Sequence, residues 1–388
     1  MQPIKKNPTV IENYSCVTAF GRGVDNFWNA CSEGKSFFEK GLLKVSPEIT
    51  EECIKFTERF KKPELLDRVS QNPLMNWSLA SLFECLEESQ WGELTERDGL
   101  VIATTTGITT TWEGTLMKHC KGEKISTPLY QPVGVFAEEI QNQLGHKGPV
   151  QIFSSACAAG SQAVAVAKNW LELGFVDRCI VLGAEELCQL TDWGFRSLSL
   201  VNGEDCKPFN ENYNNICLSE AAAVLLMSRS ENKKYHSVTG TASSSDAYSM
   251  TAPNPDGSGP KRSISGALKQ AQLKPSDIQW VHAHGTGSLQ NDQAEAAALS
   301  QLGVSSYVSS TKAVHGHSLA ASGVLESILC LESLERQKII ASHKAETKDF
   351  NINLATENTE LKVTHVLKNS LGFGGINSSL VFSHKDYL

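Results

Sequence analysis

The sequence lacks three features that would each assign a protein to a class directly. No two of its 11 cysteines form a C-x-x-C pair, so we expect neither a structural zinc site nor a thioredoxin-type redox site. No apolar run is long enough to cross a bilayer, and residues 1–10, MQPIKKNPTV, lack the apolar core of a signal peptide. We therefore expect a cytoplasmic protein without membrane insertion, whose cysteines stay reduced and are mostly packing residues.

The chain also has fewer positively charged than negatively charged residues. The chain has 35 Lys and Arg against 43 Asp and Glu, a net charge of -8, and nucleic-acid-binding proteins usually show the opposite balance. We therefore expect no nucleic-acid partner. Its 388 residues, 40% of them hydrophobic, fit a globular protein with a large core and two or so domain-sized units.

Strand and helix patterns alternate along the first half of the chain. Strands are predicted from β-branched or apolar segments at residues 99–107, 149–155, 179–186 and 221–228. A helix is predicted over residues 158–173, ended by Gly174. Such alternation predicts an α/β protein with a parallel-type sheet.

The second half of the chain repeats this plan. It has a strand running into a glycine turn at 280–287, a strand, loop and helix at 306–337, and a closing strand at 377–384. In both halves the helix begins with small uncharged residues, so two such helices can pack backbone to backbone in the middle of a layered fold. We infer an internal duplication with its boundary near the polar segment SRSENKKYHS, residues 228–237.

One cysteine stands where a nucleophile could work. Cys157 lies in FSSACAAGSQAVAVAKNW, residues 153–170, after a predicted strand and at the start of a predicted helix. The helix dipole lowers the pKa of a thiol in that position, and the unpaired backbone N–H groups of the first turn can bind an oxyanion. The same segment also fits a small hydrophobic residue that is buried and inert, so other segments must decide between the two.

Two further segments carry basic side chains in loops. His284 stands at a strand end before a tight Gly-Thr-Gly turn, where it could face a pocket or bond a backbone carbonyl. The segment STKAVHGHSLAASG carries Lys312, His315 and His317. His317 is next to the helix start, which favours a neutral imidazole that donates a hydrogen bond, whereas His315 is expected to be structural. A lysine in solvent is the alternative for Lys312.

A glycine-rich segment, NSLGFGGINSS, lies near the end of the chain at residues 369–379. Its glycines, which include Gly372 and Gly374, would let the backbone approach a ligand or adopt unusual φ angles around Phe373. The segment also fits a tight turn between strands with Phe373 in the core. No Walker or Rossmann context surrounds it, so phosphate binding is not expected.

Together, these segments resemble the condensing ketosynthases of the thiolase superfamily, the β-ketoacyl-acyl-carrier-protein synthase I/II type. The motifs SSACAAG, HGTGS, TKAVHGH and GFGG occur in the family's order, and the likeness begins at TAFGRGVDNFWNACSEGKS, residues 18–36. The resemblance implies a thiolase-like α/β fold, in which two duplicated halves form a five-layer αβαβα sandwich. Residues 1–230 would carry the nucleophile and residues 231–388 the catalytic histidines.

The resemblance also implies a reaction, a decarboxylative Claisen condensation. Cys157 would accept an acyl chain from an acyl carrier protein. His284 and His317 would form the pair that decarboxylates the malonyl group on a second carrier protein and stabilises the enolate. No metal or organic cofactor is implied, because the phosphopantetheine arm belongs to the carrier.

The same resemblance assigns roles to five further residues, of which Lys312 is expected to be catalytic. Lys312 resembles the active-site lysine of the family, and Glu295 resembles its buried acidic partner. Phe373 resembles the gating phenylalanine, whose backbone N–H would join that of Cys157 in the oxyanion hole. Gly372 and Gly374 flank it.

The sequence departs from the family pattern in two places. KPFNENYNNICLSEAAA, residues 207–223, replaces a more charged and glycine-rich family segment, and HGTGS-L replaces HGTGT-P at Ser288 and Leu289. These departures favour a polyene, polyketide-type or other secondary lipid pathway over ordinary fatty-acid synthesis. Residues 183–200, GAEELCQLTDWGFRSLSL, resemble ketosynthases of aryl-polyene clusters, which can pair with a chain-length-factor-like protein.

The resemblance leaves alternatives and implies partners. A thiolase-type acyltransferase is one alternative, but thiolases generally carry a second cysteine near the end instead of a TKxxxGH motif. A chain-length-factor-like non-catalytic subunit is another, but such subunits usually lack the cysteine. We expect an acyl carrier protein as partner and a homodimer, or a heterodimer with a chain-length-factor-like homologue. Carrier docking is predicted at Lys61, Lys62 and Arg68, because carrier proteins are acidic.

Overall fold

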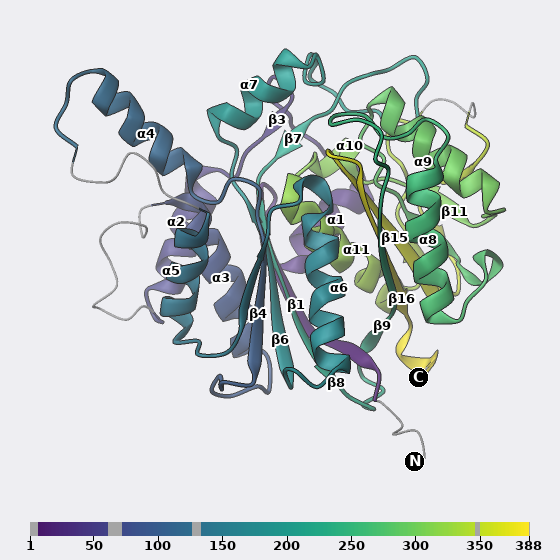
Figure 1. Cartoon of the computed structure of the whole chain (residues 1–388), viewed down its shortest axis with the longest axis horizontal. Helices are drawn as coiled ribbons and strands as arrows, with labels where there is room; N and C mark the ends of the chain where they lie inside the picture. Colours follow the sequence, from purple (N-terminus) through teal and green to yellow (C-terminus); the bar gives the residue numbers. More distant parts are fainter. Residues whose placement is uncertain (1–6, 61–71, 126–132, 346–349, 388) are drawn as a thin grey trace.

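The computed structural model describes residues 7–60, 72–125, 133–345 and 350–387. Its main feature is one large twisted sheet to which both halves of the chain contribute (Figure 1). The first half supplies β1 (Thr9–Thr18), β4 (Asp98–Ala103), β5 (Val150–Phe153), β6 (Arg178–Glu185) and β8 (Ala221–Arg229). The second half supplies β9 (His236–Ser245), β10 (Trp280–His282), β11 (Tyr307–Ser309), β15 (His365–Gly372) and β16 (Ile376–Ser383).

The two halves of the sheet have the same strand plan. The first is ordered β5-β4-β6-β8-β1 and the second β11-β10-β15-β16-β9, so the first, second, third, fourth and fifth of these strands along the chain take the same positions in each half. The second half has one more edge strand, β13 (Asn353–Leu354), which pairs in parallel with β11. In each half the two outer pairings are parallel and the two inner pairings antiparallel. The halves meet where β1 pairs with β9, at Val10 opposite Ser237 and Ile11 opposite His236.

The expectation of a parallel-type sheet was therefore wrong for the inner strands. β15 and β16 are joined by a three-residue turn, Phe373–Gly375, and a connection that short can join only antiparallel neighbours. The sheet is mixed, with its parallel pairs toward the outer edges of the two halves.

Helices cover the sheet in layers, as Figure 1 shows. On one outer side lie α2 (Pro47–Thr57), α3 (Pro73–Glu87) and α5 (Gly134–Leu144), and on the other lie α8 (Ser258–Ala271) and α9 (Leu289–Gln301). Between the two halves of the sheet lie α6 (Ala159–Glu172) and α11 (Ser322–Arg336), with α1 (Val24–Glu33) beside them. This arrangement confirms the predicted fold class, a five-layer αβαβα sandwich of thiolase type.

The two central helices meet through their backbones, as their small-residue starts predicted. A Cβ atom at Gly160 of α6 would lie 2.6 Å from the carbonyl oxygen of Ala320, and one at Gly323 of α11 would lie 2.7 Å from the Cα of Gly160. Those distances leave no room for a side chain. Every residue of α11 from Ser322 to Leu334 is buried, because the helix has protein on all sides.

Several predicted boundaries agree closely with the structure. The helix expected over 158–173 spans Ala159–Glu172, and the closing strands expected at 221–228 and 377–384 span Ala221–Arg229 and Ile376–Ser383. The strand expected to run from 280 into a glycine turn is Trp280–His282.

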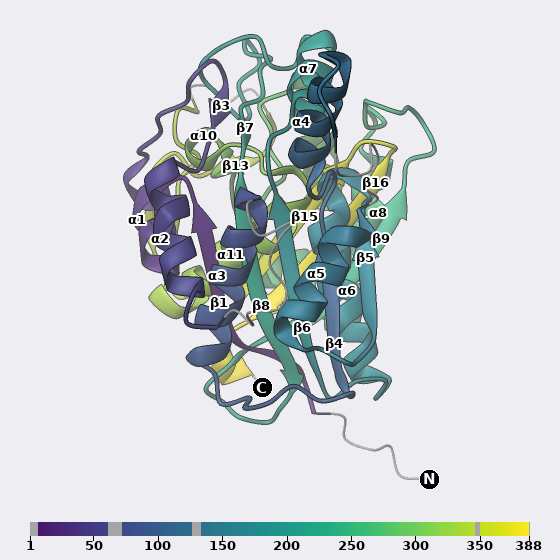
Figure 2. The ribbon, with the colours of Figure 1, turned by 90° about the vertical axis from the view of Figure 1, so that its left-hand side faces the viewer.

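One helix at a corner of the molecule packs little against the rest of the protein. α4 (Thr109–Cys120) has no buried residue and projects from the body, as Figure 1 shows, and in Figure 2 it is seen in front of α7 (Gln189–Ser197). Glu113 of α4 accepts hydrogen bonds from the backbone N–H groups of Gln189 and Leu190 at the start of α7. Met117 of α4 and Leu190 and Trp193 of α7 are exposed. Among the described residues, no helix is both long and apolar enough to cross a membrane.

Candidate active site

Cys157 lies in a single 3₁₀ turn, Ala156–Ala158, between β5 and α6. Ala156 has a φ of 50°, a left-handed conformation that costs energy for a residue with a side chain. Such strained turns before a helix project the next side chain toward the end of the sheet. A Cβ atom at Gly372 would lie 3.1 Å from the backbone nitrogen of Ala158, so the end of β15 passes close to this turn.

The environment of the thiol opposes its ionisation. Burial raises the pKa of Cys157 to about 12, and the nearby positive charge of Lys312 and backbone hydrogen bonds from Phe373 and Cys157 itself lower it only in part. The lowered pKa expected from the helix dipole was therefore wrong in direction, because only 4% of the residue is exposed to solvent. The resting side chain is a thiol, and it needs a proton acceptor when it attacks.

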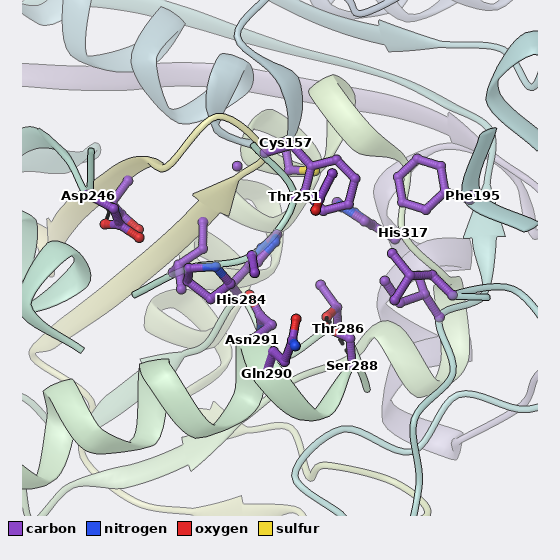
Figure 3. A pocket seen from close by; sticks show the side chains of 18 residues that line it. Cys157, Phe195, Asp246, Thr251, His284, Thr286, Ser288, Gln290, Asn291 and His317 are labelled. Atoms are coloured by element: carbon purple, nitrogen blue, oxygen red, sulfur yellow. Dashed lines mark hydrogen bonds between the residues drawn. The ribbon is translucent and has the colours of Figure 1, made fainter. Parts of the chain in front are cut away.

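Two histidines from different loops converge on this thiol (Figure 3). His284 follows β10, and His317 lies between α10 (Lys312–His315) and the start of α11. The sulfur of Cys157 and one ring nitrogen of each histidine all lie within 4.8 Å of one another. The two rings meet edge to face, with centroids 5.2 Å apart.

Both imidazoles are held neutral. Burial is the main cause that lowers the pKa of His284 and of His317 well below the usual range, and the positive charge of Lys312 adds to it. Nδ1 of His317 forms a 3.0 Å hydrogen bond with the hydroxyl of Ser322. Its Nε2 is buried and has no hydrogen-bond partner among the described residues, which leaves it for a substrate atom.

Lys312 is fully buried, so the alternative of a lysine in solvent was wrong. Its Nζ donates a 2.7 Å hydrogen bond to the carbonyl oxygen of His284 and forms an ion pair with Glu326 of α11. Burial raises the pKa of Glu326, but the charges of Lys312 and Lys368 outweigh burial and hold it well below its usual value. Lys312 therefore links the loop of His317, on which it lies, to the loop of His284 and to α11.

The acidic partner of Lys312 is thus Glu326, and the expectation that Glu295 would pair with this lysine was wrong. Glu295 accepts hydrogen bonds of 2.9 Å from the backbone N–H groups of His284 and Gly285, and one of 3.1 Å from the side chain of Asn369. It lies on α9, and it fixes the His284 turn by holding its backbone.

Phe373 occupies the turn of the β15–β16 hairpin and is partly exposed, so it lies at the pocket and not in the core. Its ring stacks on that of Phe195 from α7, with centroids 5.4 Å apart and planes at 17°. Gly374 has a φ of 82°, which favours glycine, and its N–H donates to the carbonyl oxygen of Met250 at 2.7 Å.

A pocket opens onto the thiol. Its apolar side includes Phe195, Leu200, Ile216 and Leu371. Polar side chains line another part of its wall, and Figure 3 shows them together on the far side of the pocket from Cys157: Thr286, Ser288, Gln290 and Asn291.

Sequence reasoning missed some of these residues. Thr286 and Ser288 belong to the quoted HGTGS motif, so the motif could have indicated them. Glu326 is a lone acidic residue in the apolar run SLAASGVLESILCL, a pattern that indicates a buried partner. No local signal indicated Phe195.

Four other residues were singled out from the sequence, one histidine near the site and three predicted docking residues. His315 is buried and bonds the hydroxyl of Thr311 at 2.9 Å, which agrees with the structural role expected for it. Lys61, Lys62 and Arg68, the predicted docking residues, lie outside the described residues.

Two family models match this chain in succession. The model "Beta-ketoacyl synthase, N-terminal domain" matches residues 6–233, and "Beta-ketoacyl synthase, C-terminal domain" matches residues 235–346. The chain belongs to the beta-ketoacyl synthase family. This confirms the resemblance seen in the sequence to ketosynthases of the synthase I/II type.

Curated relatives agree with this assignment. The ketosynthase is 31% identical to a 3-oxoacyl-[acyl-carrier-protein] synthase 2 of Staphylococcus aureus, over 68% of this chain and 70% of the relative. It is 28% identical to the enzyme of that name from Synechocystis sp., over 98% of this chain and 99% of the relative. The protein is thus a β-ketoacyl-[acyl-carrier-protein] synthase, an acyltransferase that elongates an acyl chain by condensation, and the non-catalytic alternative is not favoured.

Solved structures share the fold over nearly the whole chain. One contains the ketosynthase ApeO of Xenorhabdus doucetiae in complex with its chain length factor, with a TM-score of 0.82, 25% identity, and coverage of 97% of this ketosynthase and 98% of that chain. Another is a type II polyketide synthase acyl-carrier protein in complex with its ketosynthase, with a TM-score of 0.83, 24% identity, and coverage of 98% and 99%.

Proposed function

We propose that Cys157 holds the growing acyl chain and that His284 and His317 drive decarboxylation of the malonyl unit. One observation carries this proposal: the sulfur and a nitrogen of each imidazole lie within 4.8 Å of one another beside the backbone of Phe373. We propose in the same terms that residues 1–230 form the half with the nucleophile and residues 231–388 the half with the histidines.

In the first step the sulfur of Cys157 attacks the thioester carbonyl of an acyl-carrier protein. The thiol proton passes to a neutral imidazole and then to the departing carrier sulfur, so the carrier leaves as a thiol and the acyl chain becomes a cysteine thioester. The backbone N–H groups of Cys157 and Phe373 would stabilise the oxyanion of the tetrahedral intermediate.

In the second step the malonyl group loses CO₂. The electrons of the broken C–C bond form an enolate, whose oxygen accepts hydrogen bonds from neutral His284 and His317. A hydroxyl hydrogen from Ser322 to Nδ1 of His317 would leave Nε2–H as the donor. The enolate carbon attacks the acyl thioester, and the cysteine sulfur leaves as a thiolate. It then takes a proton from solvent, so each condensation consumes one proton.

The polar part of the pocket wall suits the carrier's arm. Phosphopantetheine presents amide groups, and Thr286, Ser288, Gln290 and Asn291 offer hydroxyl and amide side chains along one side of the pocket. We propose that these residues bind the arm and that the apolar side receives the acyl chain. The scheme assigns no metal or organic cofactor to the chain itself.

The pathway is a finer proposal. The departures at 207–223 and at Ser288 and Leu289 favour a polyene or polyketide-type pathway, and the resemblance of residues 183–200 favours the aryl-polyene type. The likeness to ApeO, a ketosynthase solved with its chain length factor, supports a pathway in which such a factor takes part. The reduced thiol that the chemistry requires suits the cytoplasm, and all 11 cysteines are free.

We propose two kinds of partner, an acyl carrier protein and a second ketosynthase-like subunit. Exposed apolar side chains on two neighbouring helices support the subunit, because Met117 of α4 and Leu190 and Trp193 of α7 are all at least half exposed and a partner could cover them. β5 also stands at the end of the sheet order, where a strand of another subunit can pair. The partner is a second copy or a homologue of the chain-length-factor type.

Mass spectrometry of the intact protein tests the function. The enzyme is mixed with a panel of acyl-carrier proteins, and an acyl adduct on Cys157 that malonyl-carrier protein then consumes is expected. Cys53→Ala, which alters a fully buried cysteine of α2, serves as the control and should leave the adduct intact. An adduct elsewhere, or turnover of free acyl-CoA without malonyl-carrier protein, would contradict the proposal and favour thiolase-type chemistry.

A further inference from the structure

Lys368 is a buried cation that neither the motifs nor the scheme above uses. It lies on β15 and is 0% exposed. Its Nζ lies 3.2 Å from Oε2 of Glu326, the same carboxylate whose Oε1 pairs with Lys312. A buried charge destabilises the fold unless it is paired and hydrogen-bonded. One lysine is enough to neutralise Glu326, so the second lysine points to a role other than neutralising this carboxylate.

The other contacts of Lys368 reach α6, the helix that directly follows Cys157 and is called the nucleophile helix below. Its Nζ donates to Ser161 Oγ of α6 at 3.3 Å, to the carbonyl oxygen of Asn369 at 3.0 Å, and to Ser370 Oγ. Ser161 and Ser370 also share a 2.9 Å hydrogen bond. Ser161 is four residues after Cys157, and Ser370 is three residues before Phe373, so one amine contacts both elements that form the oxyanion hole.

Through Glu326 the same amine reaches the histidine loops. Glu326 pairs with Lys312, whose Nζ donates to the carbonyl oxygen of His284 at 2.7 Å. Glu326 is also four residues beyond Ser322, which bonds His317. Lys368 therefore stands where the nucleophile helix, the strand leading to Phe373 and the two histidine loops meet.

We propose that Lys368 is a positioning residue of the condensation reaction, which sets these elements in register and adds a buried positive charge that favours the enolate over the neutral thioester. It touches no substrate and acts through Glu326, Ser161 and Ser370. The proposal rests on the roles assigned above to Cys157, His284 and His317.

The charges around Lys368 set the expected pH effect. The titratable groups facing it are Glu326 and Cys330 of α11, Lys312 of α10 and His282 of β10. The charge of Lys368 is also a minor cause of the lowered pKa of His284 and His317, after burial and Lys312. Without that charge both imidazoles bind protons more readily. As the pH is lowered, decarboxylation should therefore be lost at a higher pH than in the wild type.

The test compares two buried lysines. Lys368→Met removes the charge, and Lys168→Met is the matched control, because Lys168 is also buried but pairs with Glu172 at 2.5 Å on α6. Acylation is followed by intact mass, and CO₂ release from malonyl-carrier protein is measured against pH. For Lys368→Met we expect decarboxylation slower by on the order of tenfold, less than the loss of a direct oxyanion donor, with its acid limb moved to higher pH. Acylation should slow by less, because it depends on the register of the oxyanion hole but not on stabilisation of the enolate. Lys168→Met should match wild type in both.

Two further variants of Lys368 distinguish an effect of its charge from an effect on stability. Lys368→Arg should restore the pH profile, and Lys368→Gln should resemble Lys368→Met. Unchanged decarboxylation and pH profile in Lys368→Met would overturn the proposal. Failure of the Met, Gln and Arg variants to fold while Lys168→Met folds would also overturn it, because the residue would then serve stability alone. A wild-type enzyme without decarboxylation would instead contradict the function proposed above.

Discussion

The ring of Phe195 stacks on the ring of Phe373, with centroids 5.4 Å apart and planes at 17°. The contact joins α7, which forms one side of the pocket, to the hairpin turn whose backbone faces the sulfur of Cys157. The position of an oxyanion donor therefore depends on an aromatic ring 178 residues away in the sequence.

Phe195→Ala should slow condensation by about two- to tenfold, the equivalent of the 0.5–1.5 kcal/mol that an aromatic pair contributes. The reason is that Phe373 loses the ring that holds its turn in place. Steady-state condensation and the melting temperature are the measurements. Phe60→Ala breaks a comparable stack on Phe83, with centroids 4.6 Å apart, away from the pocket. If both variants lose activity equally, Phe195 acts through stability only.

Cys157→Gln should abolish condensation yet keep some decarboxylation of malonyl-carrier protein. The thiol is needed only to hold the acyl chain, whereas the negative charge of decarboxylation builds near His284 and His317. Release of labelled CO₂ from malonyl-carrier protein, measured beside product formation, separates the two steps. Loss of both activities in a folded variant would show that the sulfur is needed for decarboxylation as well.

His317→Ala should show the reverse pattern. The variant should form the acyl-enzyme and then stall, because removal of one oxyanion donor typically costs about a hundred- to a thousandfold in rate. Intact mass should therefore show an accumulating adduct on Cys157. Condensation at the wild-type rate, or complete failure of acylation, would contradict the role assigned to this histidine.

The buried histidines should each make the fold less stable as the pH falls below about 6.5. Burial lowers the pKa of His236, His315 and His365 to about 4 and that of His282 to about 3, whereas an unfolded histidine titrates near 6.5. Between these values the four histidines bind protons in the unfolded chain but not in the folded one, so their contribution lowers the free energy of unfolding as the pH falls from about 6.5 toward 4. Glu220 and Asp292 act in the opposite direction, because burial raises the pKa of each to about 7. Urea unfolding across this range measures the slope.

His365→Asn should flatten that slope, because it removes one of the groups that the fold keeps neutral. His119, an exposed histidine of α4, supplies the matched control His119→Asn, which should leave the slope unchanged. The same slope in His365→Asn as in the wild type would refute the linkage.

Light scattering at micromolar concentration should find a dimer, or a heterodimer when a homologue without the cysteine is present. Trp193→Asp should weaken the assembly, because it replaces an exposed apolar side chain of α7 with a charge. Tyr387→Asp changes an exposed aromatic residue at the other end of the chain and should leave the assembly intact. A fully active monomer would rule out the proposed interface.

The sequence predicted the parts of the site that short motifs carry. Cys157, His284, His317 and Phe373 each lie in a strand-to-loop segment that could be recognised by itself, and the fold brings these segments to one pocket. The strand plan was also visible, because the second half repeats the first.

Contacts between distant elements could not be predicted in the same way. Lys312 was expected to pair with Glu295, but the helix α11 presents Glu326 to its amine instead, and only the packing of α11 against β10 and β15 determines that choice. The pKa of Cys157 was expected to fall, but the depth of the pocket reverses the effect of the helix dipole. Strand direction depended on the short β15–β16 turn, which composition alone did not reveal.

The contact between Gly160 and Gly323 has a consequence for how such an enzyme can change over time. The helix of the nucleophile and the helix that follows His317 touch main chain to main chain, so no side chain at the crossing can be exchanged to alter the spacing between them. Mutation can reshape the pocket wall at α7 or at the polar residues before α9, and so alter which chain is accepted. The geometry of bond formation stays constant while substrate choice is free to diverge.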